Sequence, residues 1–409
     1  MMKILIATAF KLPGGGIWSF VSNLEKSLRK FGHVVDILCF DQENSKMIIL
    51  NENKSEDLSP YSPHVVQQLN ISCPGLGGHP WIYNAEKNRY LFEQGLSRFD
   101  LSKYDIIHAQ DVISALAISR IKNSATPLIT SVHGFLSGAV FHQLQTSSTA
   151  GSLQLWNTFL LQYYSRIEKV GYQSSDFIHT SSNWMRGIIE KEFQIPSFKI
   201  NTFQYGVDLS DFVQGPDQNR NRDRKIILSI ARLVYLKGLD YLIDALSLLK
   251  KDQDNWECWI LGEGEMEHSL KMKVKKMGLE DKVIFWGKTS KVKNILLQAE
   301  MLVLPSLQEN QPFAVIESQL MGVPAIVSNA GGLPEIVEDG KNGYVVPKEN
   351  SYELYRKIQY LLSNPNVREQ MSQYGRMQGR RNWNINRTRK NMIELYSSAL
   401  NAKSGTNIR

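Results

Sequence analysis

Cysteine is scarce in this chain, which has three among 409 residues, at Cys39, Cys73 and Cys258. Three thiols build no paired disulfide framework, and their spacing fits no metal-binding motif. Cys39 and Cys258 stand in apolar, strand-like runs, which predicts buried free thiols in a reducing compartment. The sequence therefore excludes a disulfide-stapled secreted domain and a zinc finger.

Long apolar stretches are missing as well. No run approaches the roughly 20 apolar residues that a membrane-spanning helix needs. Residues 1–10 lack a cationic start and a long apolar core, so they predict a buried strand rather than a signal peptide. We expect a cytoplasmic protein that contacts a membrane only peripherally, at its inner face.

Several ligand-binding motifs are also absent. The glycine run Gly14-Gly15-Gly16 is not Gly-x-Gly-x-x-Gly, and no Lys-Ser or Lys-Thr follows it, which disfavours dinucleotide and P-loop sites. No Asp-x-Asp stands in a loop suited to a metal–diphosphate complex, and no basic segment interleaved with aromatics indicates a nucleic-acid interface. We therefore expect no metal requirement and no nucleic-acid partner.

What the chain does contain is a regular alternation of short apolar runs with amphipathic segments. This pattern predicts parallel sheets with right-handed crossovers and helices on both faces. The expected strands are 3–8, 34–40, 105–109, 128–132, 176–180, 198–203, 226–230, 256–261, 283–286, 301–304, 325–328 and 344–346. The predicted fold class is α/β, with two Rossmann-like, doubly wound parallel-sheet domains that face each other across a cleft.

Composition also predicts the domain boundaries. Residues 214–225 have no apolar side chain and indicate a solvated linker between domains at 1–212 and 213–380. The tail at 381–409 contains an amphipathic helix, and because the second domain is complete before it, we expect this helix to cross back onto the first domain. Residues 134–151, rich in Ser, Thr and Gly, predict a mobile loop.

Two cations follow the expected strand at 226–230. Arg232 and Lys237 lie in the loop Ala-Arg-Leu-Val-Tyr-Leu-Lys-Gly, which opens a helix. A planar guanidinium and a compact ammonium beside a helix N-terminus suit a diphosphate. The glycine run is a second phosphate candidate, because consecutive glycines let backbone amides approach an anion. Two surface cations and a ligand-free tight turn remain the alternatives.

Two carboxylates, Glu309 and Glu317, stand eight residues apart. Pro312 and Gly322 bound a short helix, which puts Glu309 at a strand-to-helix turn and Glu317 inside the helix. Both then face the carboxyl edge of a parallel sheet, where α/β proteins bind ligands. Glu317 suits ribose hydroxyls, and Glu309 suits a sugar hydroxyl or positive charge developing at an anomeric carbon. A pair of solvated helix carboxylates is the alternative.

Taken in order along nearly the whole chain, these motifs resemble a retaining glycosyltransferase of family 4, with the GT-B fold of the glycosyl transferases group 1. The resemblance implies an acceptor-side N-terminal domain and a C-terminal domain that binds a nucleotide-sugar donor. Besides the residues above, it rests on Leu261-Gly262-Glu-Gly264, Phe285-Trp286-Gly287, Gly331-Gly332-Leu-Pro-Glu335, His108-Ala-Gln-Asp111, Val132-His133-Gly134 and Tyr205-Gly206-Val207-Asp208.

The resemblance implies a role for each matching residue. Arg232 and Lys237 would bind the donor diphosphate, and Glu317 the ribose. Glu309 would contact the transferred sugar, and His133 would lie near the anomeric carbon from the first domain. The other implied donor contacts are Gly15 and Gly16 at the phosphates, Gly262, the base-side turn with Trp286 and Gly287, and the backbone amides of Gln311, Phe313 and Ala314.

The implied reaction transfers a hexose with retention of configuration. The acceptor hydroxyl would attack on the face from which the nucleotide leaves, and the leaving phosphate would take its proton. Arg232 and Lys237 would stabilise the charge, so we expect a metal-independent enzyme that uses a UDP- or GDP-sugar and no cofactor. The chain departs from the family pattern at Tyr205, at 310–313 and at 318–319, so the donor sugar stays open.

The net charge of +7 favours anionic partners. Together with the aromatic segment 135–164, it favours an anionic membrane carrying a lipid-linked acceptor, and a soluble glycan acceptor is the alternative. We expect a role in cell-surface polysaccharide or glycoconjugate synthesis. Two other functions stay open. A non-catalytic nucleotide-sugar-binding subunit would bind a donor and transfer nothing, and a Rossmann-type dehydrogenase or epimerase would purify with nicotinamide.

Overall fold

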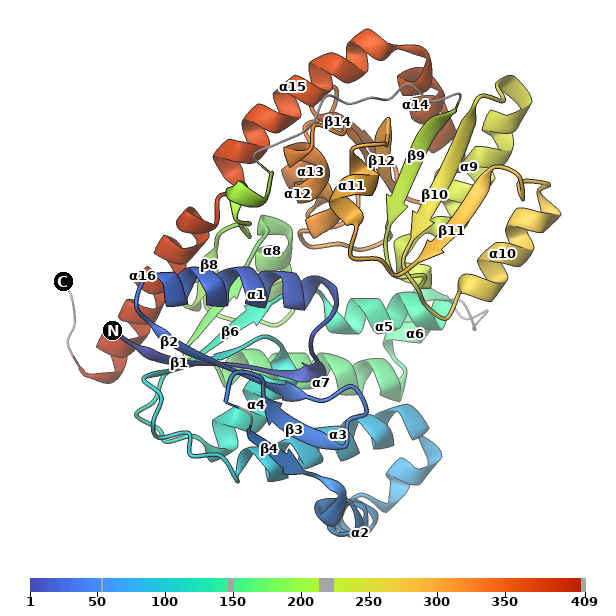
Figure 1. Ribbon diagram of the computed structural model, residues 1–409. Coiled ribbons are helices and arrows are strands. Elements are labelled where there is room, and N and C mark those ends of the chain that lie inside the picture. The colour runs from blue at the N-terminus through green and yellow to red at the C-terminus, as the bar shows by residue number, and fades with distance from the viewer. Residues whose placement is uncertain (53, 146–150, 213–223, 406–409) are drawn as a thin grey trace. The chain divides into compact units, whose positions relative to one another are not determined.

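The structure is a computed structural model that describes residues 1–52, 54–145, 151–212 and 224–405 (Figure 1). The chain divides into two compact units. Unit 1 comprises the described residues of 1–141, 149–207 and 385–409, and unit 2 those of 142–148 and 208–384. The sequence placed its junctions at 212/213 and 380/381, whereas the units change at 207/208 and 384/385. Most of the predicted linker lies outside the described residues.

Unit 1 contains a sheet with the strand order β4-β3-β2-β1-β5-β6-β7-β8. Its parallel strands are β1 (Lys3–Lys11), β2 (Val34–Phe40), β5 (Ile106–Ala109), β6 (Leu128–Val132), β7 (Phe177–Thr180) and β8 (Ile200–Thr202). The strands β3 (Lys46–Ile49) and β4 (Lys54–Asp57) add an antiparallel edge. The sequence pattern did not predict this edge, because strands of four residues are too short to show a clear apolar alternation, and β4 has no apolar side chain.

Helices cover both faces of this sheet, with α1 on one face and α3, α4 and α7 on the other (Figure 1). The helix bounds are α1 (Gly15–Lys30), α2 (Ser62–Ser72), α3 (Pro80–Leu96), α4 (Val112–Ile121), α5 (Leu136–Gln145), α6 (Ser152–Trp156), α7 (Phe159–Gln173) and α8 (Asn183–Lys191).

The helix α5 contradicts the loop predicted over 134–151 for residues 136–145, and residues 146–150 of this prediction lie outside the described residues. The buried Glu168 carboxylate on α7 accepts hydrogen bonds from the amides of Leu136 at 2.8 Å and Ser137 at 2.9 Å. These are first-turn amides, which have no acceptor within their own helix. A cap supplied from 31 or more positions away leaves no mark on the local sequence, so the helix was missed.

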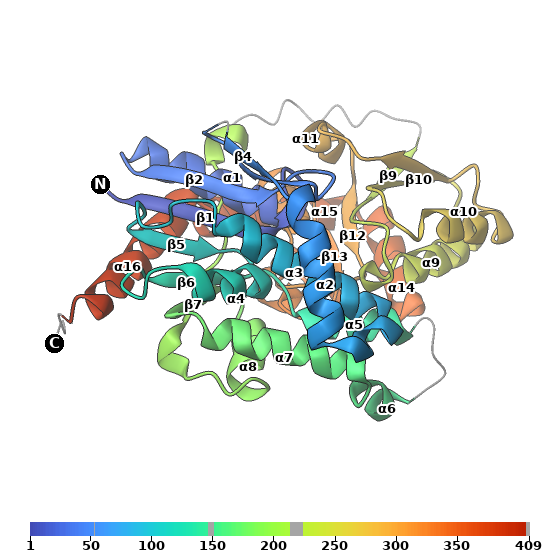
Figure 2. The ribbon, with the colours of Figure 1, turned by 90° about the horizontal axis from the view of Figure 1, so that it is seen from below.

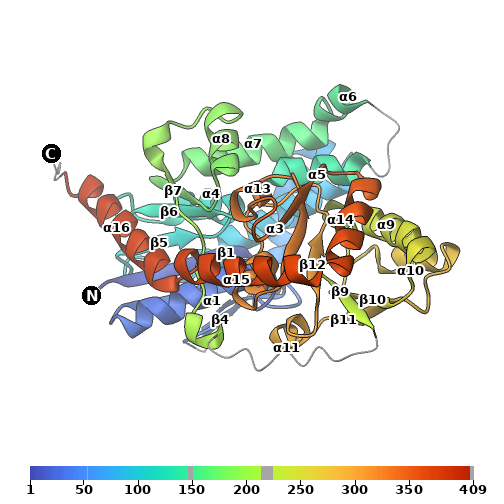
Figure 3. The same ribbon diagram turned by 90° about the horizontal axis from the view of Figure 1, so that it is seen from above.

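The helix α16 (Ile385–Lys403) belongs to unit 1 and packs along α1 (Figure 3). Its first residue lies against Gly206, where an added Cβ would be 2.7 Å from the Ile385 Cα. The Ile385 amide also donates to the Val207 carbonyl at 3.0 Å. Further along, the Tyr396 hydroxyl lies 2.8 Å from Nδ1 of the fully buried His108. The tail helix is therefore hydrogen-bonded to unit 1 at its start and along its length.

Unit 2 contains a parallel sheet with the strand order β11-β10-β9-β12-β13-β14. Its strands are β9 (Lys225–Ile230), β10 (Trp256–Leu261), β11 (Val283–Gly287), β12 (Met301–Leu304), β13 (Ala325–Ser328) and β14 (Gly343–Val346). With helices packed on these sheets, the prediction of two α/β units with parallel sheets is confirmed, apart from the antiparallel edge of unit 1.

The helices of unit 2 include three that lie side by side, α9 (Leu239–Asp252), α10 (Glu267–Lys276) and α14 (Ser351–Ser363) (Figure 2). The others are α11 (Val292–Leu296), α12 (Phe313–Leu320), α13 (Leu333–Ile336) and α15 (Pro365–Asn382), and α12 packs against α15. Among the described residues, no helix combines the length and the apolar character needed to span a bilayer.

We expect Tyr396→Phe to destabilise unit 1, because it deletes one partner of a buried hydrogen bond and leaves Nδ1 of His108 unpaired. The expected loss is about 1–3 kcal/mol of unfolding free energy, measured by urea denaturation. The matched control is Tyr352→Phe on α14, where the side chain is 60% exposed and a change within about 0.5 kcal/mol is expected. Equal stabilities of the two variants would contradict this role for Tyr396.

Candidate functional site

The carboxyl edge of the unit 2 sheet brings the predicted donor-binding loops into backbone contact. Gly331 has φ of 63°, and a Cβ there would be 1.9 Å from the Glu309 carbonyl oxygen. Gly262 has φ of 133°, and a Cβ there would be 1.9 Å from the Ala231 carbonyl oxygen. Only glycine fits both the conformation and the space. These glycines let the loops after neighbouring strands close on one another around Glu309 and beside Arg232.

Two predicted ligands of the donor are already paired with each other. The Lys237 ammonium, at the end of the 3-10 turn Tyr235–Lys237, forms an ion pair with Oε1 of Glu309. The two side chains are only 15% and 11% exposed. Glu309 also accepts a hydrogen bond from the Ser306 hydroxyl at 3.2 Å. Ser306 was not singled out from the sequence, although its position two residues after the predicted strand 301–304 was an available signal.

Arg232 stands in the same loop as Lys237 but does not share its partner. It lies two residues beyond β9, and its side chain is exposed. Within the described ranges, its guanidinium forms no ion pair and no side-chain hydrogen bond. A guanidinium at a sheet's carboxyl edge without a carboxylate partner is available to a phosphate.

Glu317 is a carboxylate without a hydrogen-bond donor in the part of the chain that the structure describes. It lies on α12, and burial raises its pKa to about 7, while the charge of Lys293 opposes the rise. Partial burial of a carboxylate without donors is unfavourable, and hydroxyl donors from a ligand would stabilise its ionised form. The site therefore favours a ligand that carries hydroxyl groups.

The start of α12 supplies amides between the two glutamates. The helix begins at Phe313, directly after Pro312, so the amides of Phe313 and Ala314 belong to its first turn. First-turn amides carry partial positive charge and have no acceptor within their own helix. Gln311, two residues before Phe313, is buried. The amides that the resemblance assigns to the donor therefore lie at or just before the start of α12, close to Glu309 in sequence.

The turns after β10 and β11 are joined at the predicted base side. The Gly262 amide donates to the Gly287 carbonyl at 2.9 Å. The ring of Trp286 is exposed and lies 5.0 Å from the ring of Trp259, which stands in the middle of β10. The Trp286 ring therefore packs beside a ring from β10, whereas the Trp286 backbone belongs to β11, the outermost strand of the sheet.

In unit 1, the glycine loop opens α1. A Cβ at Gly15 or Gly16 would meet no atom within 4 Å, so packing does not demand a glycine at either position. Gly15 has φ of 70°, which favours glycine for conformational reasons. Both residues are exposed, which leaves the amides at the helix start accessible to an anion.

His133 follows β6, and both of its ring nitrogens are engaged. Nδ1 lies 2.6 Å from the Tyr205 hydroxyl, and Nε2 lies 3.0 Å from Oε1 of Gln110. The Gln110 side-chain amide donates to the His108 carbonyl at 3.3 Å, so its oxygen faces His133. We therefore assign the proton to Nε2 of His133, with Nδ1 accepting from Tyr205. Burial, helped by the charge of His179, lowers the pKa of His133 to about 3, which keeps the ring neutral.

The predicted residues thus fall into two sets, each within its own unit. Unit 2 joins Lys237 to Glu309 and places Arg232, Glu317 and the α12 amides on loops or helices at the same sheet edge. Unit 1 holds the glycine loop and His133. In the described stretches of the chain, no group of three or more His, Cys, Asp or Glu side chains is arranged to hold a metal ion.

Two family models match consecutive parts of this chain. The model described as Glycosyltransferase Family 4 matches residues 14–211, and the model described as Glycosyl transferases group 1 matches residues 213–378. The first covers most of the unit 1 sheet and the glycine loop. The second covers the whole sheet of unit 2 and both glutamates.

Relatives share this organisation to different extents. The uncharacterized glycosyltransferase MJ1607 of Methanocaldococcus jannaschii is 25% identical over 423 residues, covering 100% of this chain and 97% of its own. An uncharacterized glycosyltransferase of Haemophilus influenzae is 33% identical over 38% of this chain, and the amylovoran biosynthesis glycosyltransferase AmsK of Erwinia amylovora is 30% identical over 39%. These two matches span 44% and 41% of the relatives' own lengths.

Solved structures share the fold. The crystal structure of Anabaena HepE in complex with UDP and glucose has a TM-score of 0.69 and 16% identity, covering 97% of this chain and 100% of that chain. The two family models match adjoining parts of the chain, and the structure contains both α/β units. This protein therefore belongs to the family 4 glycosyltransferases of the GT-B fold.

Proposed function

We propose that this protein is a retaining hexosyltransferase that moves a sugar from a nucleotide diphosphate to a glycan or lipid-linked acceptor. The observation that carries the proposal is the Lys237–Glu309 ion pair at the edge that also holds the unpartnered Glu317 carboxylate. Support comes from HepE, whose crystal structure contains UDP and glucose, and from AmsK, which is named for amylovoran biosynthesis. We infer a role in polysaccharide synthesis in the cytoplasm, at the inner face of the membrane.

The charges of the site explain how a donor would bind. In the structure Lys237 and Glu309 neutralise each other, and Arg232 has no carboxylate partner among the described residues. A diphosphate brings negative charge that matches both cations, so it would draw Lys237 away from Glu309. The released Glu309 carboxylate would then accept hydrogen bonds from the sugar, and Glu317 would accept them from the ribose. Donor binding thus exchanges one ion pair for several charge-assisted contacts.

The transfer step needs no protein nucleophile in this proposal. The bond between the anomeric carbon and the diphosphate oxygen breaks, and the acceptor oxygen attacks from the same face. The acceptor's proton passes to the departing phosphate oxygen, whose charge Arg232 and Lys237 stabilise. Both ring nitrogens of His133 are occupied, so we assign it a positioning role through Tyr205 and Gln110 and not acid–base chemistry.

We expect Arg232→Ala and Lys237→Ala each to lower kcat/KM at least about 100-fold, because each removes a cation from the leaving diphosphate. Both should also weaken nucleotide-sugar binding in calorimetry. The matched control is Lys275→Ala on α10, an exposed lysine outside the site. NMR of the product should show a retained anomeric configuration, and an inverted product would contradict the mechanism. If the wild-type protein bound a nucleotide sugar but transferred the sugar from no donor tested, it would be a non-catalytic subunit.

We expect nucleotide-sugar affinity to rise with pH up to about 7 and then to level off. Glu317 is protonated below its pKa of about 7, and it must be ionised to accept two ribose hydroxyls. Below this pKa, binding must release a proton, so affinity should fall by up to about tenfold per pH unit. In Glu317→Gln the slope should vanish. With the wild-type protein, the affinity for a donor analogue without ribose hydroxyls should not depend on pH. A pH dependence that persists in Glu317→Gln or with this analogue would contradict the role of Glu317.

We expect transfer to continue at an undiminished rate in an excess of chelator, because Arg232 and Lys237 supply the positive charge at the diphosphate. The measurement is the initial rate with and without EDTA, followed by addition of Mg²⁺ or Mn²⁺. Loss of activity that either metal restores would show that the cations do not suffice.

A further inference from the structure

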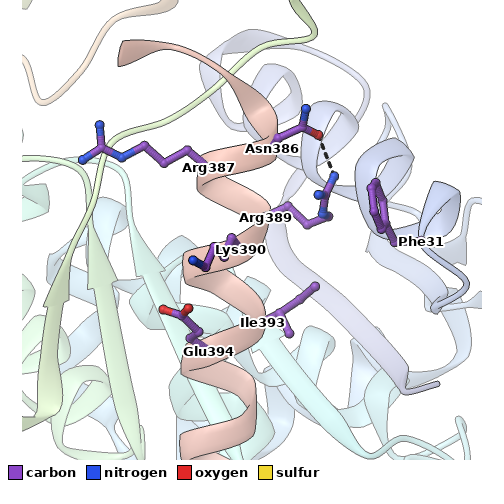
Figure 4. Close-up of a pocket in the computed structure, with 7 residues that line it drawn as sticks. All are labelled: Phe31, Asn386, Arg387, Arg389, Lys390, Ile393 and Glu394. Carbon is purple, nitrogen blue, oxygen red and sulfur yellow. Dashed lines mark hydrogen bonds between the residues drawn. The ribbon is translucent and has the colours of Figure 1, made fainter. Parts of the chain in front are cut away.

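An open groove of about 630 Å³ lies where the end of α1 meets the first turns of α16, entirely within unit 1 (Figure 4). Its lining residues are Phe31, Asn386, Arg387, Arg389, Lys390, Ile393 and Glu394. The glycine loop stands at the opposite end of α1. At about 1.5 Å per residue, the 16 residues of this helix put roughly 24 Å between the two ends. The groove is therefore separate from the predicted phosphate loop.

Arg389 is the central cation of the groove, and within the described parts of the chain its side-chain partners are neutral. Its guanidinium lies 3.3 Å from the centroid of the Phe31 ring and donates to Oδ1 of Asn386 at 2.7 Å and to the Ser27 hydroxyl at 3.1 Å (Figure 4). Burial lowers its pKa, yet an arginine stays charged at neutral pH. A partly desolvated cation without a carboxylate partner makes an anion favourable at this place.

The same two helices carry further cations, and Arg387 extends from the side of α16 opposite to Arg389 (Figure 4). Arg387 and Lys390 are exposed on α16, and Lys26 and Lys30 are exposed on α1. None of these four forms an ion pair within the described ranges. Glu394 is the carboxylate in the lining, and the nearby Glu25 is already paired with Arg29.

His33 responds to the resulting positive field. Its pKa is lowered by burial and further by the charges of the N-terminal ammonium and Arg389. His33 belongs to the turn between α1 and β2, so the charge of Arg389 acts on this turn as well. The surface therefore attracts negative charge over an area wider than one side chain.

Exposed apolar side chains lie on the same surface as these cations. The Phe31 side chain is 55% exposed, and Met1 and Val34 are exposed beside it. The Val34 amide donates to the Met2 carbonyl at 3.0 Å, which fixes the N-terminus next to the turn. Basic and apolar groups on one surface match the two layers of a membrane interface, the headgroups and the outer acyl chains.

We propose that this surface, the docking face, binds a bilayer rich in anionic lipid. The docking face comprises Met1, Lys26, Lys30, Phe31, Val34, Arg387, Arg389 and Lys390. Headgroup phosphates contact the cations, and Phe31 and Met1 enter the interface. An acidic polypeptide would satisfy the charges but would leave the apolar side chains uncovered, which favours the bilayer. The argument is independent of the donor chemistry.

The docking face is separate from the segment 135–164, for which the sequence predicted a membrane contact and of which residues 146–150 lie outside the described residues. In the structure, the Phe135 and Phe141 rings stack on the Trp156 ring at centroid distances of 6.2 Å and 4.9 Å. Aromatic rings that cover one another offer less apolar surface to lipid. The sequence did not reveal the docking face because its two groups of residues, one within 1–34 and one within 387–390, lie more than 350 positions apart in the chain.

The test is sedimentation of the full chain with vesicles of phosphatidylcholine alone or mixed with phosphatidylglycerol. We expect binding to the anionic vesicles only, weakening as salt rises. Each cation near an anionic surface contributes roughly fivefold to binding, so Arg387→Gln combined with Lys390→Gln should weaken it about 25-fold. The matched control, Lys275→Gln with Lys276→Gln on α10, changes the net charge equally and should stay within about twofold. Thermal melts of both pairs verify folding.

Three outcomes would overturn the proposal. One is no sedimentation with phosphatidylglycerol vesicles, and the second is an equal loss in the two double variants, which would indicate overall charge. The third is binding to polyglutamate, but not to vesicles, that depends on Arg387 and Lys390, which would identify an acidic polypeptide as the partner. Phe31→Ala should weaken vesicle binding without any change in net charge. No nucleotide sugar is present, so failure here is distinct from failure of the transferase proposal.

Discussion

Lys237 and Glu309 are 72 positions apart in the chain, and their ion pair depends on the pairing of β9 with β12. Parallel strands end at the same edge, so the loops that follow these neighbours necessarily meet. A largely buried ion pair adds little net stability, because desolvation offsets the attraction. Its position at the edge proposed to bind the donor is better explained by an anion that would compete with Glu309 for Lys237. The close glycine contacts at Gly262 and Gly331 hold this arrangement in place.

In unit 1, His133 lies in a cluster of neutral imidazole rings that pack around Phe20. Nε2 of His108 lies 2.7 Å from the Ser131 hydroxyl, which lies 2.8 Å from Nδ1 of His179. Burial lowers the pKa of both histidines, so this chain of hydrogen bonds forms between uncharged rings. The Phe20 ring packs against the rings of all three histidines. Because α16 joins the cluster through Tyr396, the tail helix is part of what holds this interior together.

The helix α1 links two proposed functions within unit 1. Its first residues are exposed glycines suited to a phosphate, and its last residues carry the cations of the docking face. A helix has partial positive charge at its N-terminus and partial negative charge at its C-terminus, so basic residues at the last turn also stabilise the helix itself. What distinguishes the docking face is the addition of Arg389 from α16, stacked on Phe31, with no carboxylate partner.

The sequence alone determined the parallel strands and the sheet edge proposed to bind the donor, because apolar periodicity and strand-to-helix turns are local properties, whereas β3, β4 and α5 left no such pattern. It located Arg232, Lys237, Glu309 and Glu317 for the same reason, since each stands just after a strand or in the following helix. Only the tertiary structure decided that Lys237 contacts Glu309 and that Tyr205 and Gln110 occupy the nitrogens of His133. Such contacts depend on strand order and helix packing, which bring together residues whose separation in the chain leaves no local pattern.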